Sequence, residues 1–82
     1  MLNVIVLGTG CPNCRKLEQL CYDVAAKNNL DMNLEKVTDI SKFADYGIML
    51  TPGLVINGKV MSGGKIPTKS TLTHWMMEAN RV

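Results

Sequence analysis

The hydrophobic pattern changes abruptly within the first third of the chain. Residues 2–7 are apolar at nearly every position and rich in Val and Ile, as in a central strand that is buried on both faces. From residue 12 onward the apolar positions recur at steps of three and four, which predicts a helix over about 12–27. Residues 8–10 read Gly-Thr-Gly, a sequence that lets the backbone turn tightly. The pattern therefore predicts a strand, a tight turn and a helix.

The next segment alternates between apolar and polar residues. Over residues 31–37, the apolar side chains of Met32 and Leu34 are separated by polar ones, which is typical of a half-buried edge strand. A strand, a helix and a second strand within about 36 residues form a βαβ unit. We therefore expect the two strands to be parallel and joined by a right-handed crossover.

A short apolar stripe follows this second strand. Residues 38–39 are Thr and Asp, which are residue types that cap the start of a helix. The stripe consists of Ile40, Phe43 and Ala44. Gly47 supplies a residue that readily ends a helix. The pattern predicts a short helix between the second strand and Gly47.

The last third of the chain predicts a hairpin and a closing helix. Two β-like runs, 54–56 and 59–61, flank the dipeptide Asn57-Gly58, which is the strongest short hairpin signal in a sequence. Residues 67–68 (Pro-Thr) open a last helix, and its apolar face consists of Leu72, Trp75, Met76 and Ala79. The predicted order is β-α-β-α-β-β-α, an α/β chain that forms one domain over residues 1–82.

Composition and charge narrow the functions that are open to the chain. It has 82 residues, of which 46% are hydrophobic and 20% charged, so its core is modest but ordinary for a globular domain. The net charge is +2 without a run of Lys or Arg, which argues against nucleic acid or a membrane surface as a partner. No apolar run approaches the ~20 residues that span a bilayer, and no basic segment begins the chain. We expect a cytoplasmic monomer.

The three cysteines carry the candidate chemistry. An odd number does not fit a disulfide-stapled secreted scaffold, and a close pair in a reducing compartment is more often catalytic or metal-binding. Cys11 and Cys14 lie where the predicted strand gives way to the helix. The first N–H groups of a helix carry partial positive charge and stabilise a thiolate, and Arg15 and Lys16 add further positive charge. We expect Cys11 to be the nucleophile and Cys14 to resolve the mixed disulfide.

A metal clip is the main alternative for this pair. A structural zinc site needs about four ligands, and Cys21 and His74 are the remaining Cys and His candidates. Cys21 shares the apolar stripe of the first helix, so we expect it to pack in the core. We expect His74 at the surface, because it lies beside the apolar stripe of the last helix. Thiol–disulfide exchange is favoured, with no metal and no cofactor; a metal carrier and a non-catalytic binding module remain open.

A C-x-x-C motif beside a βαβ pattern is a known sequence cue for a thioredoxin-like redox motif. Three features together resemble the thioredoxin superfamily: the motif at residues 11–14, the pair Thr51-Pro52 before the third strand, and the hairpin at residues 57–58 with a closing helix. More narrowly, the chain resembles the small redox-active disulfide proteins of prokaryotes, which are glutaredoxin-sized and thioredoxin-like. The resemblance implies a thioredoxin fold with a four-stranded mixed sheet in the order 4-3-1-2 and helices on both faces. It also implies that Pro52 is cis and packs against the Cys pair.

The resemblance further implies an activity and its partners. It implies a thiol–disulfide oxidoreductase that reduces protein disulfides, with Cys11 and Cys14 catalytic. Substrate would bind at Thr51 and Pro52, and at residues 12–13 (Pro-Asn). The backbone of Thr51 would pair with the extended chain of the substrate. A thioredoxin-reductase-like protein or glutathione would supply electrons, and both donors remain open because residues 12–13 and 62–64 are similar to glutaredoxin features.

Two features differ from typical thioredoxins. No Trp precedes the first Cys, and the first strand contains no carboxylate that could accept a proton in the interior. Met49 and Leu50 directly precede Thr51-Pro52, where they would suit substrate docking. We nevertheless expect both to pack in the core, because a small domain needs most of its apolar residues there.

Overall fold

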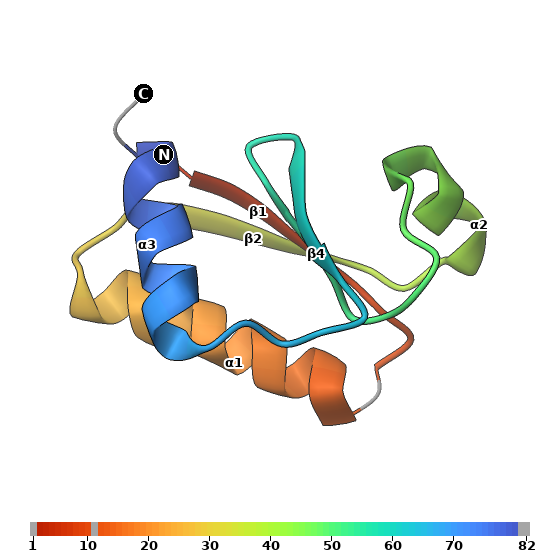
Figure 1. The fold of residues 1–82 in the computed structure, drawn as a ribbon, viewed down its shortest axis with the longest axis horizontal. Coiled ribbons are helices and arrows are strands. Elements are labelled where there is room, and N and C mark those ends of the chain that lie inside the picture. The colour runs from red at the N-terminus through yellow and green to blue at the C-terminus, as the bar shows by residue number, and fades with distance from the viewer. Residues whose placement is uncertain (1, 11, 81–82) are drawn as a thin grey trace.

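A four-stranded mixed sheet forms the centre of the structure, a computed structural model that describes residues 2–10 and 12–80 (Figure 1). The strands are β1 (Leu2–Leu7), β2 (Met32–Val37), β3 (Gly53–Ile56) and β4 (Lys59–Gly63). They lie in the order β2-β1-β3-β4, with β1 parallel to β2 and antiparallel to β3, and β4 antiparallel to β3. This is the predicted sheet order, and the predicted element order is confirmed with it.

The strand β1 lies inside the sheet and supplies side chains to both of its faces. Leu2, Val4 and Val6 belong to one hydrophobic cluster, whereas Leu7 belongs to a second cluster with Ile5 packed against it. This division follows from the alternation of side chains along a strand. It explains why β1 is apolar at nearly every position.

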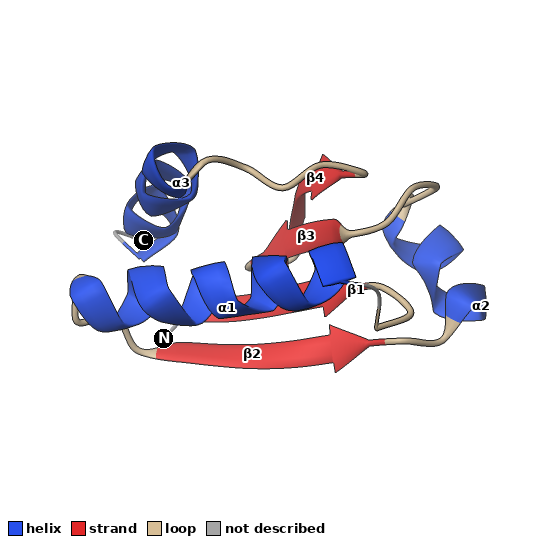
Figure 2. Ribbon diagram, turned by 90° about the horizontal axis from the view of Figure 1, so that it is seen from below, coloured by secondary structure: helices blue, strands red, loops and turns tan. Residues whose placement is uncertain are grey.

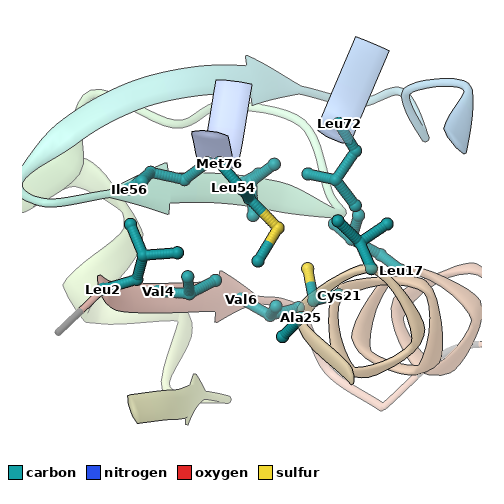
Figure 3. Close-up of a cluster of buried hydrophobic side chains, with 11 residues drawn as sticks. Leu2, Val4, Val6, Leu17, Cys21, Ala25, Leu54, Ile56, Leu72 and Met76 are labelled. Carbon is teal, nitrogen blue, oxygen red and sulfur yellow. The ribbon is translucent and has the colours of Figure 1, made fainter. Parts of the chain in front are cut away.

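The helices cover the two faces of the sheet unequally, and Figure 2 looks onto the face that the long first helix crosses. The helices α1 (Pro12–Lys27) and α3 (Lys69–Asn80) pack on one face. The other face is covered by α2 (Ile40–Phe43) and the 3₁₀ turn η1 (Ala44–Tyr46). The larger cluster, between α1, α3 and the sheet, consists of Leu2, Val4, Val6, Leu17, Cys21, Val24, Ala25, Leu54, Ile56, Leu72 and Met76. Figure 3 shows the sulfur atoms of Cys21 and Met76 pointing into the space that this cluster fills.

The predicted short helix is present, but its predicted apolar face is wrong. The side chain of Asp39 accepts a hydrogen bond from the Ser41 backbone N–H at 3.0 Å, and Gly47 ends η1 in the left-handed conformation. Of the expected stripe, Phe43 is buried, whereas Ile40 is 67% exposed and Ala44 is also exposed. The α-helix lasts only one turn before it tightens into the 3₁₀ turn. A single turn directs one apolar side chain toward the sheet rather than three.

The hairpin turn also ties distant parts of the chain together. Asn57 and Gly58 have positive φ angles of 49° and 82°, as the predicted tight turn requires. The side-chain oxygen of Asn57 accepts a hydrogen bond from the Asn3 backbone N–H at 2.9 Å, and its amide donates to the Ala79 carbonyl at 3.3 Å. The Asn57 backbone N–H donates to the Asn3 carbonyl at 2.7 Å. One turn residue thereby connects the hairpin, the start of β1 and the end of α3.

The boundaries of four elements differ from the prediction by one or two residues. The strand β3 begins at Gly53 rather than at residue 54, and β4 ends at Gly63 rather than at residue 61. The strand β2 begins at Met32 rather than at residue 31. The helix α3 begins at Lys69, and Thr68 precedes it as a capping residue whose hydroxyl accepts a hydrogen bond from the Thr71 backbone N–H at 3.2 Å. Within the described ranges, none of the helices is both long and apolar enough to cross a membrane.

Cys21 lies in the core, as its place in the apolar stripe of α1 predicts. Its side chain has no solvent exposure. Burial, with a smaller contribution from the negative charge of Glu18, raises the pKa of the Cys21 thiol from 9.0 to about 12. The thiol therefore stays protonated at neutral pH and behaves as a small apolar side chain.

Replacement of Asn57 by Ala should destabilise the fold. The variant loses the hydrogen bonds to Asn3 and Ala79 and places a less tolerant residue in the left-handed conformation. We expect a loss of about 1–3 kcal/mol in the free energy of unfolding, measured by urea denaturation. Asn33→Ala, at an exposed position of the edge strand β2, is the matched control. Equal stability of the two variants would contradict the linking role of Asn57.

Alkylation should distinguish Cys21 in the folded protein from an ordinary thiol. At pH 9 about half of an ordinary thiol is ionised, but only roughly a thousandth of a thiol with a pKa near 12. We expect iodoacetamide to leave Cys21 unmodified in the native protein and to label it rapidly in urea, as read by peptide mass. Rapid labelling of Cys21 under native conditions would contradict the burial of its side chain in the core.

Candidate functional site

The candidate site lies where β1 ends and α1 begins. The Gly8 backbone N–H donates to the Val37 carbonyl at 3.0 Å, so the pairing of β1 with β2 continues one residue beyond the strand. The chain then turns through Gly10, whose φ is +87°. Cys14 lies in the first turn of α1 and is 5% exposed. Cys11, the predicted nucleophile, lies outside the described residues.

Gly8 and Cys14 approach each other too closely for any other residue at position 8. A Cβ atom added to Gly8 would lie 2.1 Å from the Sγ atom of Cys14 and 3.0 Å from its Cβ atom. Real side chains do not reach such distances, so the glycine is needed for close packing rather than for an unusual φ. The contact fixes the Cys14 thiol against the end of β1.

The segment with Thr51 and Pro52 reaches the same end of the sheet. The Thr51–Pro52 peptide bond is cis, and Pro52 is buried whereas Thr51 is exposed. Leu7 of β1 pairs with Gly53 of β3, and the two strands are antiparallel. The register therefore places Pro52 beside Gly8, the residue that Cys14 contacts. The Gly64 backbone N–H donates to the Pro52 carbonyl at 2.9 Å and holds this segment to the end of β4.

The other predicted binding residues lie at the surface. Pro12 and Asn13 form the exposed start of α1, in the same turn as Cys14, and Arg15 and Lys16 are exposed directly after it. The first turn of α1 contains no acidic residue. The first turn of α1 therefore carries only positive or neutral side chains, which favours a thiolate at the start of the helix.

The expectation that Met49 and Leu50 pack in the core is wrong. Met49 is 94% exposed and Leu50 is 68% exposed, whereas their neighbour Ile48 is buried. Ile48 alone fills the space over Gly53, where an added Cβ atom would lie 2.2 Å from its Cδ1 atom. Leu50 lies over Gly64 on the outside of the molecule. Two adjacent apolar side chains are thus displayed just before Thr51 and Pro52.

The sequence analysis missed a small hollow beside Cys14. It has a volume of about 160 Å³, and it is lined by Val6, Gly8, Gly10, Cys14, Arg15, Glu18, Lys36 and Thr38. Two of these residues form an ion pair, in which the Glu18 Oε2 atom lies 3.7 Å from the Lys36 Nζ atom. The four-residue spacing of Cys14 and Glu18 was the available signal, because residues so spaced share one face of a helix. For Lys36, which lies in the edge strand β2, no sequence spacing indicated a position beside Cys14.

A larger hollow of about 600 Å³ lies away from the cysteine motif, between the hairpin and α3. It is lined in part by Asn57 and Trp75, at the end of β3 opposite to Gly53. Cys21 lies in the core and His74 is exposed on α3, so the two remaining metal candidates are not assembled with Cys14. Within residues 2–10 and 12–80, no three Cys, His, Asp or Glu side chains are grouped as a metal site requires.

Replacement of Gly8 by Ala should disturb the site and the fold together. The added methyl group would displace the Cys14 side chain or separate β1 from α1. We expect a loss of about 1–3 kcal/mol in the free energy of unfolding, as for other overpacked positions, read from urea denaturation. Thr9→Ala, at the exposed next residue, is the control and should be close to the parent protein. A Gly8→Ala protein of unchanged stability would contradict the close contact.

Comparison with known proteins agrees with this architecture. A family model described as a thioredoxin domain matches residues 2–77. The chain is 26% identical over 72 residues to a protein named thioredoxin from Methanothermobacter thermautotrophicus, which covers 88% of this chain and 94% of that protein. It is 29% identical over 68 residues to a thioredoxin from Methanocaldococcus jannaschii, covering 83% of this chain and 78% of that protein.

A solved structure is similar in fold. The J-Trx1 fragment of ERdj5 superposes with a TM-score of 0.67 at 19% identity, and the match covers 99% of this chain and 44% of that chain. At this identity the likeness shows the fold alone, which is the thioredoxin fold that the sequence resemblance implied. The family model spans nearly the whole chain and the archaeal thioredoxins align over most of it, so the chain belongs to the thioredoxin domain family.

Proposed function

We propose that this chain is a thiol–disulfide oxidoreductase that reduces disulfides of other proteins through Cys11 and Cys14. Membership of the thioredoxin domain family and the two relatives named thioredoxin support this class of activity. The observation that carries the proposal is the position of Cys14. Its thiol lies in the first turn of α1, against Gly8 and at the end of the sheet that Pro52 reaches.

The proposed reaction has two exchange steps. The Cys11 thiolate attacks one sulfur of a substrate disulfide, forms a mixed disulfide and releases the first substrate thiolate. Cys14 then loses its proton and attacks the Cys11 sulfur, which forms the Cys11–Cys14 disulfide and releases the second substrate thiolate. The two substrate thiolates take up protons, so the substrate gains two electrons and the protein loses two. A thioredoxin-reductase-like protein or glutathione returns these electrons to the dithiol.

The segment before β3 is the proposed docking site for the substrate chain. Thr51 is exposed, and an extended peptide that pairs with its backbone would run past the start of α1, where Pro12 and Asn13 lie. Met49 and Leu50 offer exposed apolar surface beside this backbone. A reducing activity of this kind belongs in a compartment that keeps thiols reduced, such as the cytoplasm.

Substitution of each cysteine separates the two proposed roles. Cys11→Ser should abolish exchange, because it removes the attacking thiolate. Cys14→Ser should still attack substrate but accumulate the mixed disulfide, because nothing resolves it. Non-reducing electrophoresis and peptide mass after incubation with a disulfide-containing protein such as insulin distinguish these outcomes. Cys21→Ala is the control and should trap nothing. Equal trapping by the Cys11 and Cys14 variants would overturn the assignment.

A redox titration of the metal-free protein tests the activity class itself. We expect one reversible two-thiol transition confined to Cys11 and Cys14, with thiols alkylated and counted by mass. The potential would also rank the protein as reductant or oxidant, since about 30 mV corresponds to a tenfold change in the equilibrium of this two-electron couple. The absence of a reversible transition, together with stoichiometric zinc or copper binding, would favour a metal carrier instead.

A further inference from the structure

The carboxylate of Glu18 lies in the neighbourhood of the thiol that the proposed reaction must deprotonate. Cys14 and Glu18 are four residues apart on α1, so they lie on one face of the helix and one turn apart. Both line the hollow of about 160 Å³ at the end of β1. A space of this volume holds several water molecules, each of which occupies about 30 Å³ in the liquid. Water can therefore connect the carboxylate to the thiol.

The side chain of Glu18 is held in place rather than free in solvent. It is 23% exposed, and its Oε2 atom lies 3.7 Å from the Lys36 Nζ atom, whose side chain is 60% exposed. Lys36 pairs with Val6 in the register of β2 and β1, on the sheet face that α1 covers. The negative charge of Glu18 also acts on the buried thiol of Cys21, three residues further along α1. These observations place the carboxylate between the helix and the sheet.

The chemistry of the second exchange step needs a group of this kind. Cys14 is 5% exposed and attacks only after losing its proton, whereas the strand β1 contains no carboxylate to receive it. We propose that Glu18, positioned by Lys36, is the general base that accepts the proton of Cys14 through water during resolution of the mixed disulfide. This inference rests on the proposed function, because it assigns a role within that reaction.

The proposed proton transfer balances. The Cys14 thiol gives its proton to the Glu18 carboxylate, and the Cys14 thiolate attacks the Cys11 sulfur of the mixed disulfide. The Cys11–Cys14 bond forms as the bond between Cys11 and the substrate sulfur breaks. The departing substrate thiolate takes up a proton from water, and the Glu18 carboxylic acid returns its proton to water.

The charges around the hollow favour this transfer. Arg15 on α1 and Lys36 on β2 line the hollow together with Glu18. The β1 side of the lining, Val6 and Gly8, contains no titratable group. Cys21 is the next titratable residue along α1 whose thiol is affected by Glu18. As the proton moves, negative charge passes from the carboxylate to the thiolate. Arg15 and Lys36 line the hollow together with Cys14 and Glu18, so positive charge lies in the same space before and after the transfer. Lys36 acts through Glu18 and is a positioning residue.

Two-phase kinetics with an aromatic disulfide tests the inference. The reduced protein is mixed with a symmetrical aromatic disulfide whose thiolate absorbs visible light; the first phase reports attack by Cys11 and the second reports attack by Cys14. For Glu18→Gln we expect the second phase to slow roughly 10- to 100-fold, at or below the lower end of what a positioned general base contributes. Its pH profile should also move to higher pH, whereas the rate of the first phase stays unchanged. Lys36→Met should affect the second phase in the same direction but less.

Glu35→Gln is the matched control, because it also removes one negative charge. Glu35 is next to Lys36 in β2, but its side chain lies on the opposite face of the sheet. Its two phases should equal those of the parent protein, and circular dichroism checks that each variant is folded. An unchanged second phase in folded Glu18→Gln, or equal slowing of both phases, would overturn the role of Glu18 while leaving the proposed function intact. A parent protein without a second phase would overturn the proposed function, and this inference with it.

Discussion

The close packing of Gly8 against Cys14 is the contact on which the site depends. The strand β1 is buried on both faces, so its position is fixed by two hydrophobic clusters. The helix α1 is fixed against the sheet through Leu17, Cys21 and Val24. Strand and helix therefore meet at a defined distance, and the thiol of Cys14 fits only because residue 8 has no side chain. The core of the domain thus sets the position of the Cys14 sulfur.

Most of the fold could be predicted from the sequence because each local signal agreed with the global arrangement. The apolar run of β1, the three- and four-residue spacing in α1 and the Asn57-Gly58 turn each have one physical reading, and each is present in the structure. The one-turn helix α2 was predicted with the wrong face. A segment of four residues is too short for periodicity to define which side chains point inward.

The candidate site was only partly predictable, since it combines segments that are distant in the chain. The position of Cys14 at a helix start could be predicted from the local pattern, whereas the place of Pro52 near the Cys pair was predicted only from the family resemblance. The exposure of Met49 and Leu50 was not predictable, because hydrophobicity alone does not tell which of three consecutive apolar residues fills the single available space. Ile48 occupies it over Gly53. The hollow beside Cys14 depends on Lys36, whose approach to α1 is set by the register of β2 against β1.

That register also explains why a helix, rather than a strand, would supply the carboxylate. A charged side chain within β1 would lie between two hydrophobic layers, where an ionised group loses its hydration and has few partners. Glu18 instead extends from α1 toward the end of β1, and its carboxylate lies close to Lys36 of the edge strand β2. There its charge faces Lys36, whose side chain remains largely in solvent, so the pair keeps part of its hydration. A carboxylate at this edge can exchange protons with water, which a group sealed within the apolar core would do only slowly.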